Sequence, residues 1–314
     1  MDPVELIAVE FVEVEASALT TWTMAKFLDS DSVTSLTELT GGNEAYTKKA
    51  CKEIVNALGI LRGRPVHDES EIPNLLGITL SALQNDLALA TAISSLRSAI
   101  SQIQSVHNGV TLTEALGCDR ENSVQLYANI NRSMARDRSP SAFASQAMRA
   151  IENGFEIVKC APFDEVERPN SLEDTMKMAS TGIERVSRIR RAVGEDATIL
   201  VDCHSRFDEV SAILICAKLA KFDIGWFEEP VDLGIPFDSQ ANIASMTATP
   251  IAGGELVYGR ELFDELVASG AVNTVMPDVK YCGGVGEAVA IGRSAINAGG
   301  NVSLHSPSGP VSLL

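Results

Sequence analysis

The chain has 314 residues, of which 45% are hydrophobic and 21% charged, so it is long and apolar enough to bury a substantial core. Lys and Arg number 25 against 42 Asp and Glu, which gives a net charge of −17. Because no basic cluster offsets this charge, we expect neither nucleic acid nor an anionic membrane surface as a partner. If an acidic chain binds an acidic small molecule, it needs a local cation, such as a metal ion or a few placed Lys and Arg.

The N-terminal sequence and the cysteines bear on the cellular compartment. The first residues lack a basic segment and contain Glu every few positions, which is not the pattern of a signal peptide. No apolar run is long enough to span a bilayer. The six cysteines show no CxxC spacing, so we interpret them as reduced thiols and expect a cytoplasmic protein.

The N-terminal third of the chain predicts a small sheet followed by helices. Residues 4–16 alternate Val, Ile and Phe with Glu, as in a half-exposed strand, and residues 20–42 contain two further Thr- and Val-rich runs. Helical patterns follow over residues 43–61, 81–106 and 111–116. We therefore predict an α+β capping domain over residues 1–122.

From residue 123 onward, apolar strands alternate with helices, which predicts a parallel sheet covered on both faces. The predicted strands are 124–130, 155–161, 198–204, 224–230, 249–255, 272–278 and 301–307. The main helices between them are 141–153, 172–193, 210–221, 260–269 and 286–298. Seven units at near-constant spacing favour a (β/α) barrel of the TIM type with seven recognisable strands. We predict this barrel domain over residues 123–314, incomplete at its C-terminal end, and expect the natural chain to continue beyond Leu314.

Most of the predicted strands end in polar residues. These residues are Lys159, Asp202, His204, Glu228, Glu229, Glu255, Asp278 and His305. The acidic positions 202, 228, 255 and 278 follow one another at steps of 26, 27 and 23 residues, compared with about 31 in an average barrel unit. Because the C-terminal ends of barrel strands meet at one rim, where active sites are built, we expect these side chains around one mouth.

Three of these side chains, Asp202, Glu228 and Glu255, are carboxylates on consecutive strands, and they would repel one another if left bare. A hard divalent cation removes this repulsion. All-oxygen ligands favour Mg²⁺ or Ca²⁺ over zinc, and open positions for water and substrate favour Mg²⁺. The alternative is that the acids are solvated strand ends or helix N-caps.

Proton chemistry is expected from the remaining strand-end groups. Asp278 and His305 follow neighbouring strands, so a carboxylate-oriented general base is expected there. Lys159 would bind a substrate carboxylate or move a proton. His204 lies two residues after Asp202, on the same side of the strand.

His204 has two interpretations. It is either a nitrogen ligand of the metal or, as we favour because Mg²⁺ prefers oxygen, an acid that protonates a leaving group. Arg206 and Glu229 are further candidates for substrate binding.

The segments VKCA, ILVDCHSRF, WFEEP, AGGE, MPDVKYCGG and SLHSPSGP together resemble the mandelate racemase subgroup of the enolase superfamily, above all its galactonate dehydratase-like acid-sugar dehydratases. The resemblance covers the whole chain, with a capping domain followed by the barrel. It implies that Asp202, Glu228 and Glu255 bind Mg²⁺. It also implies that His305 with Asp278 removes the proton α to a substrate carboxylate, and that His204 is the acid on the departing 3-hydroxyl. Lys159 matches the first lysine of the family's Lys-x-Lys motif.

The resemblance predicts a hydro-lyase that forms a metal-stabilised enediolate from a sugar acid and expels the 3-hydroxyl to give a 2-keto-3-deoxy acid. Ala161 stands where many members have a second Lys, which argues against two-base racemisation. The alternatives are a racemase, epimerase or cycloisomerase on the same scaffold, and a non-catalytic barrel. We expect a small-molecule sugar acid as substrate and a homo-oligomer.

Overall fold

Residues 2–17, 20–118, 123–131, 134, 136–168 and 170–313 are described in a computed structural model of the chain. The chain divides into two compact units, each of which is described by itself. Unit 1 comprises Met1–Asn122, Glu255–Asp264 and Val275–Leu314, and unit 2 comprises Ser123–Gly254 and Glu265–Thr274. The predicted domain boundary at residue 122 falls outside the described residues and stays a prediction.

Unit 1 contains an antiparallel sheet built from β1 (Leu6–Ser17), β2 (Thr20–Asp29) and β3 (Thr34–Glu38), in the order β1-β2-β3. Strand β2 is central, and its side chains alternate between the two faces, so that Ala25 and Phe27 are fully buried. The three strands predicted from the Val/Glu and Thr/Val patterns are confirmed.

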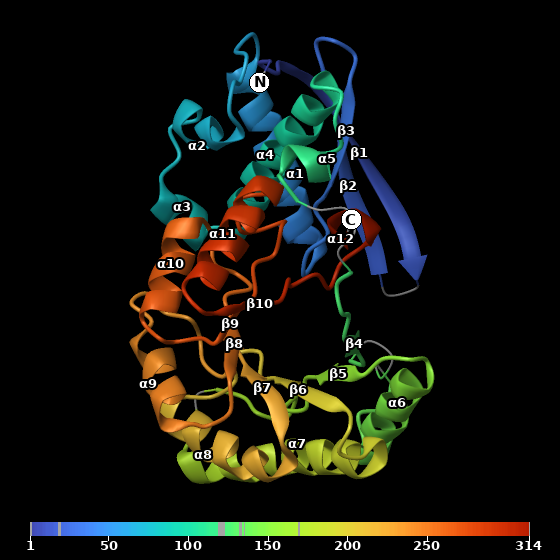
Figure 1. The fold of residues 1–314 in the computed structure, drawn as a ribbon, viewed down its shortest axis with the longest axis vertical. Helices are drawn as coiled ribbons and strands as arrows, with labels where there is room; N and C mark the ends of the chain where they lie inside the picture. The colour runs from blue at the N-terminus through green and yellow to red at the C-terminus, as the bar shows by residue number, and fades with distance from the viewer. Residues whose placement is uncertain are drawn as a thin grey trace. The chain divides into compact units, whose positions relative to one another are not determined.

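Helices cover this sheet, and Figure 1 shows α1 and α4 beside it. The helices of this segment are α1 (Glu44–Leu61), η1 (Glu69–Glu71), α2 (Ile72–Leu75), α3 (Leu80–Asn85), α4 (Leu87–His107) and α5 (Leu112–Ala115). The single helix predicted over 81–106 is wrong. Asp86 adopts an extended conformation (φ −134°, ψ 93°), and its side chain accepts a hydrogen bond from the Leu89 amide, so it ends α3 and caps α4.

Helix α4 is the centre of the core of unit 1. Its residues Ile93, Leu96 and Ile100 are buried in one cluster with Phe27 of β2 and Ile54 of α1. Each aliphatic or aromatic side chain that leaves water in this way contributes about 1.5–3 kcal/mol. The apolar side chains that α4 packs against β2 and α1 therefore hold it in place.

A buried arginine on α4 fixes the later part of unit 1. Arg97 is ion-paired with Glu69 and, at 2.8 Å, with Glu287 of α11 (Val285–Asn297). Because Arg97 is only 5% exposed, its two carboxylate partners supply the counter-charge that water cannot. Two further elements of unit 1 are β10 (Asn301–Val302) and α12 (Pro310–Leu313).

Unit 2 holds most of the second sheet. This sheet has seven strands, of which β10 belongs to unit 1: β4 (Ala128–Asn129), β5 (Ile157–Cys160), β6 (Thr198–Asp202), β7 (Ile224–Glu228), β8 (Ile251–Gly253), β9 (Thr274–Val275) and β10, in the order β10-β9-β8-β7-β6-β5-β4. The pairings from β4 to β8 are parallel. The alternating α/β class with seven strands and a separate N-terminal sheet is confirmed.

The strands are shorter than the apolar runs predicted. Strands β4, β9 and β10 have two residues each, so the hydrogen-bonded ladder covers only part of each predicted apolar run. The sheet order places β10 and β4 at its two ends, and β1, β2 and β3 pair among themselves in the other sheet.

The helices of unit 2 lie around the outside of its strands in Figure 1, from α9 at the left through α8 and α7 below to α6 at the right. They are α6 (Pro140–Glu152), α7 (Leu172–Val193), α8 (Glu209–Leu219), η3 (Ala220–Phe222) and α9 (Asp238–Met246), followed by α10 (Arg260–Ala268), which spans the boundary of the two units. Helix α9 was not predicted, because its polar and small residues give little helical periodicity. None of the helices in the described ranges has the length and hydropathy that a membrane span requires.

Helix α7 approaches the segment after β5 closely at Gly182. A Cβ atom placed there would lie 2.3 Å from Cδ1 of Phe163 and 2.8 Å from the carbonyl oxygen of Pro162. One turn further on, Arg185 donates hydrogen bonds to the carbonyl oxygen of Pro162 and to both carboxylate oxygens of Glu165, at 2.6–2.7 Å. These contacts hold the segment that follows β5 against α7.

We expect Gly182→Ala to destabilise the protein. The added methyl group meets a ring and a backbone oxygen, and such overpacking costs about 1–3 kcal/mol, more than the about 0.5–1 kcal/mol by which Ala favours a helix over Gly. Thermal and urea unfolding followed by circular dichroism would measure the change.

The matched control is Gly59→Ala, an exposed position in α1 where an added Cβ meets nothing within 4 Å. This variant should melt at or above the temperature of the parent protein. A Gly182→Ala variant as stable as Gly59→Ala would contradict the close packing of α7.

Candidate active site

In unit 2, two predicted carboxylates lie side by side at the ends of neighbouring strands. Asp202 is the last residue of β6 and Glu228 the last of β7, and the two are paired in the parallel register. Lys159, the third residue of β5, is 2% exposed, and Asp202 and Glu228 are equally buried. Three charged side chains are therefore removed from water together.

The ammonium group of Lys159 joins the two carboxylates. Its Nζ donates a hydrogen bond to Oε1 of Glu228 and lies 3.4 Å from Oδ2 of Asp202. Burial opposes the charge of Lys159, but the Coulombic attraction of Glu228 and Asp202 outweighs it and raises the pKa of Lys159 above its ordinary value. Lys159 therefore stays cationic.

Asp202 also interacts with His204. The His204 amide donates to Oδ1 of Asp202 at 3.0 Å, and Nε2 of the His204 ring lies 3.2 Å from Oδ2. Burial alone would raise the pKa of Asp202, but the hydrogen bond with His204 and the charge of Lys159 lower it to about 2. His204 itself is half exposed, so its ring is open to a ligand.

Two aromatic residues that the sequence analysis did not single out complete this cluster. Nε1 of Trp226 donates to Oε2 of Glu228 at 2.8 Å, and the ring of Tyr127 lies 5.5 Å from Nζ of Lys159. The two rings meet edge to face, with centroids 5.9 Å apart. The tryptophan was visible in the WFEEP segment, but only the paired strands show that its indole N–H reaches Glu228.

The predicted substrate-binding residues Glu229 and Arg206 contact backbone groups. Oε1 of the buried Glu229 accepts a hydrogen bond from the Gly254 amide at 2.6 Å. Nη1 of Arg206 donates to the carbonyl oxygens of Val166 at 2.7 Å and Asp164 at 3.2 Å. Both side chains thus hold loops at the strand ends in the described structure.

The backbone is strained where these strands end. His204, Ser205 and Glu229 have positive φ angles of 48°, 54° and 40°. Residues other than Gly adopt this region at a cost of about 1–3 kcal/mol, and such residues are concentrated at functional sites. The turn after β6 therefore holds His204 in a backbone conformation that a regular strand does not provide.

In unit 1, Asp278, His305 and Glu255 lie together as a second group. Nδ1 of His305 is 2.8 Å from Oδ2 of Asp278, and Nε2 of His305 is 3.2 Å from Oε2 of Glu255. Asp278 is fully buried, whereas Glu255 and His305 are about four-fifths buried. The structure thus brings together, within this unit, the predicted base, its carboxylate partner and one predicted metal ligand.

Lys280 joins this group and was missed by the sequence analysis. Its Nζ lies 2.7 Å from Oδ2 of Asp278, the oxygen that also faces His305, and its backbone amide donates to Oδ1 at 2.8 Å. Burial alone would raise the pKa of Asp278, but the hydrogen bond with His305 and the charge of Lys280 lower it. The spacing Asp-x-Lys is present in the segment MPDVK, but nothing in the sequence indicates that the lysine is buried.

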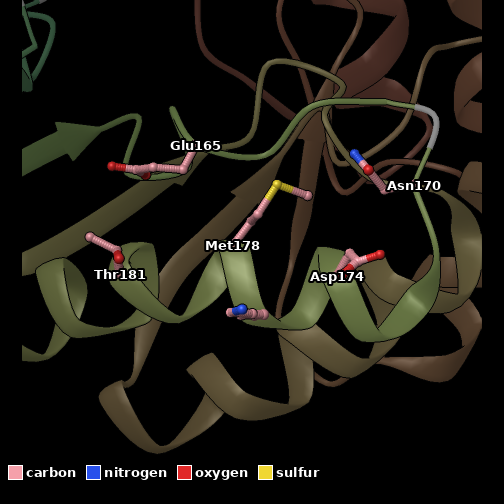
Figure 2. A pocket seen from close by; sticks show the side chains of 6 residues that line it. Glu165, Asn170, Asp174, Met178 and Thr181 are labelled. Atoms are coloured by element: carbon pink, nitrogen blue, oxygen red, sulfur yellow. The ribbon is translucent and has the colours of Figure 1, made fainter.

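A surface pocket of about 440 Å³ lies elsewhere in unit 2, along α7 (Figure 2). It is lined by Glu165, Asn170, Asp174, Lys177, Met178 and Thr181. None of the predicted site residues lines it, and Glu165 is already paired with Arg185. The candidate functional groups are therefore the strand-end cluster of unit 2 and, described separately, the group around His305 in unit 1.

Comparison with known proteins places this site in context. Residues 142–314 match the sequence model of the family described as "Enolase C-terminal domain-like". D-gluconate dehydratase of Thermoproteus tenax is 30% identical over 230 residues, which cover 73% of this chain and 45% of that protein. D-galactarolactone cycloisomerase of Agrobacterium fabrum is 29% identical over 226 residues, which cover 71% of this chain and 55% of that protein. The matched part thus spans about half the length of these relatives.

The fold has a counterpart among solved structures. A member of the enolase superfamily from Salmonella Typhimurium superposes with a TM-score of 0.83 at 20% sequence identity, covering 99% of this chain and 82% of that chain. At this identity the likeness establishes the fold alone.

We expect Lys159→Met to destabilise the protein strongly when no divalent cation is present. The substitution leaves the buried carboxylates of Asp202 and Glu228 without a cation, and breaking a buried ion pair in this way costs about 3–5 kcal/mol. Urea unfolding in the presence of EDTA would measure the loss. Lys177→Met, at an exposed position of α7, is the matched control and should stay within about 0.5 kcal/mol of the parent protein. Equal stability of the two variants would show that the ion pairs of Lys159 contribute little.

Proposed function

Since the chain belongs to the enolase C-terminal domain-like family, as its strand-end motifs predicted, we propose that it is a Mg²⁺-dependent dehydratase of a sugar acid. The observation that carries the proposal is the contact of His305 with Asp278 on one ring nitrogen and with Glu255 on the other. This is the arrangement that a general base beside a metal-bound carboxylate requires. The relative named D-gluconate dehydratase supports the reaction class.

His305 is the proposed base. Asp278 is held as an anion by Lys280, so it accepts a hydrogen bond from Nδ1–H of His305. With Glu255 bound to the proposed metal ion, Nε2 of His305 would carry the lone pair that takes a proton. When Nε2 takes the proton α to the substrate carboxylate, the negative charge of Asp278 stabilises the imidazolium that forms. Asp278 and Lys280 thus act through His305, as positioning residues.

The oxygen donors fit a hard cation. In unit 2, the carboxylates of Asp202 and Glu228 both face one positive group, the ammonium of Lys159, so they already converge on a site of positive charge. The strand-end positions and the family resemblance add Glu255 as the third proposed Mg²⁺ ligand. Bound there, Mg²⁺ would supply positive charge where negative charge grows on the substrate carboxylate as the α proton leaves.

His204 is the proposed acid. Its Nε2 lies 3.2 Å from Oδ2 of Asp202, and the half-exposed ring can reach a substrate. Transfer of its proton to the 3-hydroxyl releases water, and the resulting enol tautomerises to a 2-keto-3-deoxy acid. In this scheme the α proton goes to His305, and the departing hydroxide leaves as water with the proton of His204. Proton exchange with solvent then restores both histidines, so the net change in the sugar acid is the loss of one water.

The other predicted residues support this scheme at the strand ends. Lys159 is proposed to keep the carboxylates of Asp202 and Glu228 together and to offer positive charge to the substrate carboxylate. Arg206 and Glu229, which hold neighbouring loops, are proposed to shape the substrate site rather than to react.

A cycloisomerase is the second candidate function, because one relative is named D-galactarolactone cycloisomerase. That reaction would use the same proton abstraction but would not release a 2-keto acid. Racemisation is less favoured, because residue 161 is a buried Ala that offers no second base. A cytoplasmic location, which the six free thiols suit, and a homo-oligomeric state stay predictions.

The test separates the two histidines. The parent chain is incubated with Mg²⁺ and a panel of sugar acids in D₂O, and both deuterium exchange at the α carbon and 2-keto product are followed. We expect His305→Asn to lose exchange and product together by about 10²–10⁴-fold, because the general base is gone. We expect His204→Asn to keep exchange and lose product, because only the departure of the hydroxyl needs its proton.

His67→Asn serves as the matched control, since His67 is exposed and takes no part in the proposed site. It should behave as the parent chain does. Exchange at the parental rate in His305→Asn would remove His305 as the base. A lactone consumed or formed without any 2-keto acid would favour the cycloisomerase.

A further inference from the structure

A second group of metal-ligating side chains lies in the capping sheet of unit 1, apart from the residues of the proposed active site. Asp29 is the last residue of β2, Asp31 lies in the turn that leads to β3, and His107 is the last residue of α4. One carboxylate oxygen of each Asp and one ring nitrogen of the His lie within 4.8 Å of one another. This is the one such group of three or more found in the described part of the chain.

The distances suit a shared ion. Nε2 of His107 lies 2.9 Å from Oδ2 of Asp29 and 4.0 Å from Oδ2 of Asp31. Nitrogen and oxygen ligands bound to one Zn²⁺ ion at about 2.0–2.2 Å lie roughly 3–4.4 Å apart, depending on the angle between them. An ion between the three side chains therefore requires little movement.

A buried carboxylate oxygen without a hydrogen bond points to the same place. Asp29 is only 1% exposed. Its Oδ1 accepts hydrogen bonds from the amides of Asp31 at 3.0 Å and Val33 at 2.7 Å. Its Oδ2 is buried without a hydrogen bond to any described group, and so is Nε2 of His107, although the two atoms are close.

Such an arrangement is unfavourable as it stands. A buried carboxylate oxygen that gives up its water and gains no donor loses free energy on folding, and a ring nitrogen beside it does too. The two atoms approach each other without the alignment that an N–H···O bond needs. A cation bound to both lone pairs would satisfy them at once.

We propose that Asp29, Asp31 and His107 form a binding site for a divalent transition metal ion, for which Zn²⁺ is the appropriate probe. An imidazole nitrogen among the ligands favours Zn²⁺ over Mg²⁺ or Ca²⁺, which prefer oxygen alone. His107 stands at the C-terminal end of α4, where the partial negative charge of the helix favours a cation. Asp31 is 74% exposed, so water completes the coordination.

The ion would join the β2–β3 turn to the end of α4. Both elements belong to unit 1, and Phe27 of β2 and Ile100 of α4 are already part of its core. The site would therefore stabilise the capping sheet against its central helix, and it does not depend on the reaction proposed for the strand-end groups.

The test is a metal titration of the whole chain after EDTA treatment, with Mg²⁺ in excess throughout to saturate any all-oxygen site. We expect one equivalent of Zn²⁺ to bind by calorimetry and to raise the melting temperature in a concentration-dependent way. Co²⁺ in place of Zn²⁺ should give visible absorption bands that report a nitrogen ligand. No enzymatic activity is needed for either measurement.

Variants assign the ligands. His107→Gln should abolish the Co²⁺ bands and weaken Zn²⁺ binding at least about tenfold, whereas His67→Gln, an exposed histidine of the same unit, should change neither. Asp31→Asn alters an exposed side chain that the fold does not need, and it should also weaken binding. If Zn²⁺ leaves the parent melting temperature unchanged, or if both Asp31→Asn and His107→Gln bind as the parent does, the group is an ordinary His–Asp ion pair and the proposal is wrong.

Discussion

Buried charge at the strand ends is the constraint on which the rest of the candidate site depends. In unit 2, Asp202 and Glu228 end neighbouring strands with almost no exposure, and they remain ionised because Lys159 lies between them. Ion pairs of this kind are not in general needed for stability, since replacing buried ion pairs by apolar side chains often leaves the free energy of unfolding unchanged or raises it. Three charges at this depth therefore need not stabilise the fold, and their retention supports the Mg²⁺ site proposed for these residues.

Unit 1 also buries a carboxylate beside a lysine, but with different residues. The carboxylate of Asp278 is buried, and Lys280 and His305 share one of its oxygens. The ammonium group of Lys280 keeps the carboxylate of Asp278 ionised, and this carboxylate orients the imidazole of His305. Lys280 therefore acts on His305 indirectly, through Asp278. The two proposed proton carriers differ in surroundings as a result: His305 is enclosed by two carboxylates, whereas His204 is half exposed on a strained turn.

The ligand groups proposed in the two sheets differ in donor chemistry. The strand-end carboxylates offer oxygen alone and face a cationic side chain, which suits a hard ion that also meets substrate. The group in the capping sheet adds an imidazole, and two of its buried atoms make no hydrogen bond among the described residues. A protein can select different cations at two sites in this way, because the type of ligand, rather than affinity alone, determines which cation each site prefers.

The sequence by itself determined the order and class of the elements and the identity of the strand-end residues. Periodicity in the apolar residues marks parallel strands and helices, and a polar residue after an apolar run marks a strand end whatever its neighbours are. Asp202, Glu228, Asp278 and His305 were therefore found from the chain alone. Helix ends were less certain: the break at Asp86 depends on one side chain that accepts the Leu89 amide, and a helical pattern on both sides conceals it.

Only the tertiary structure decided which groups touch. The sequence alone allowed Lys159 to face solvent or substrate, whereas in the structure it is buried between two carboxylates from neighbouring strands. Three further contacts were not predictable from the sequence pattern: Lys280 with Asp278, the indole of Trp226 with Glu228, and His107 with Asp29. Charge compensation and hydrogen bonding act over a few ångströms in space, whereas sequence patterns record only spacing along one chain, and so these contacts exist only once the strands and helices have packed.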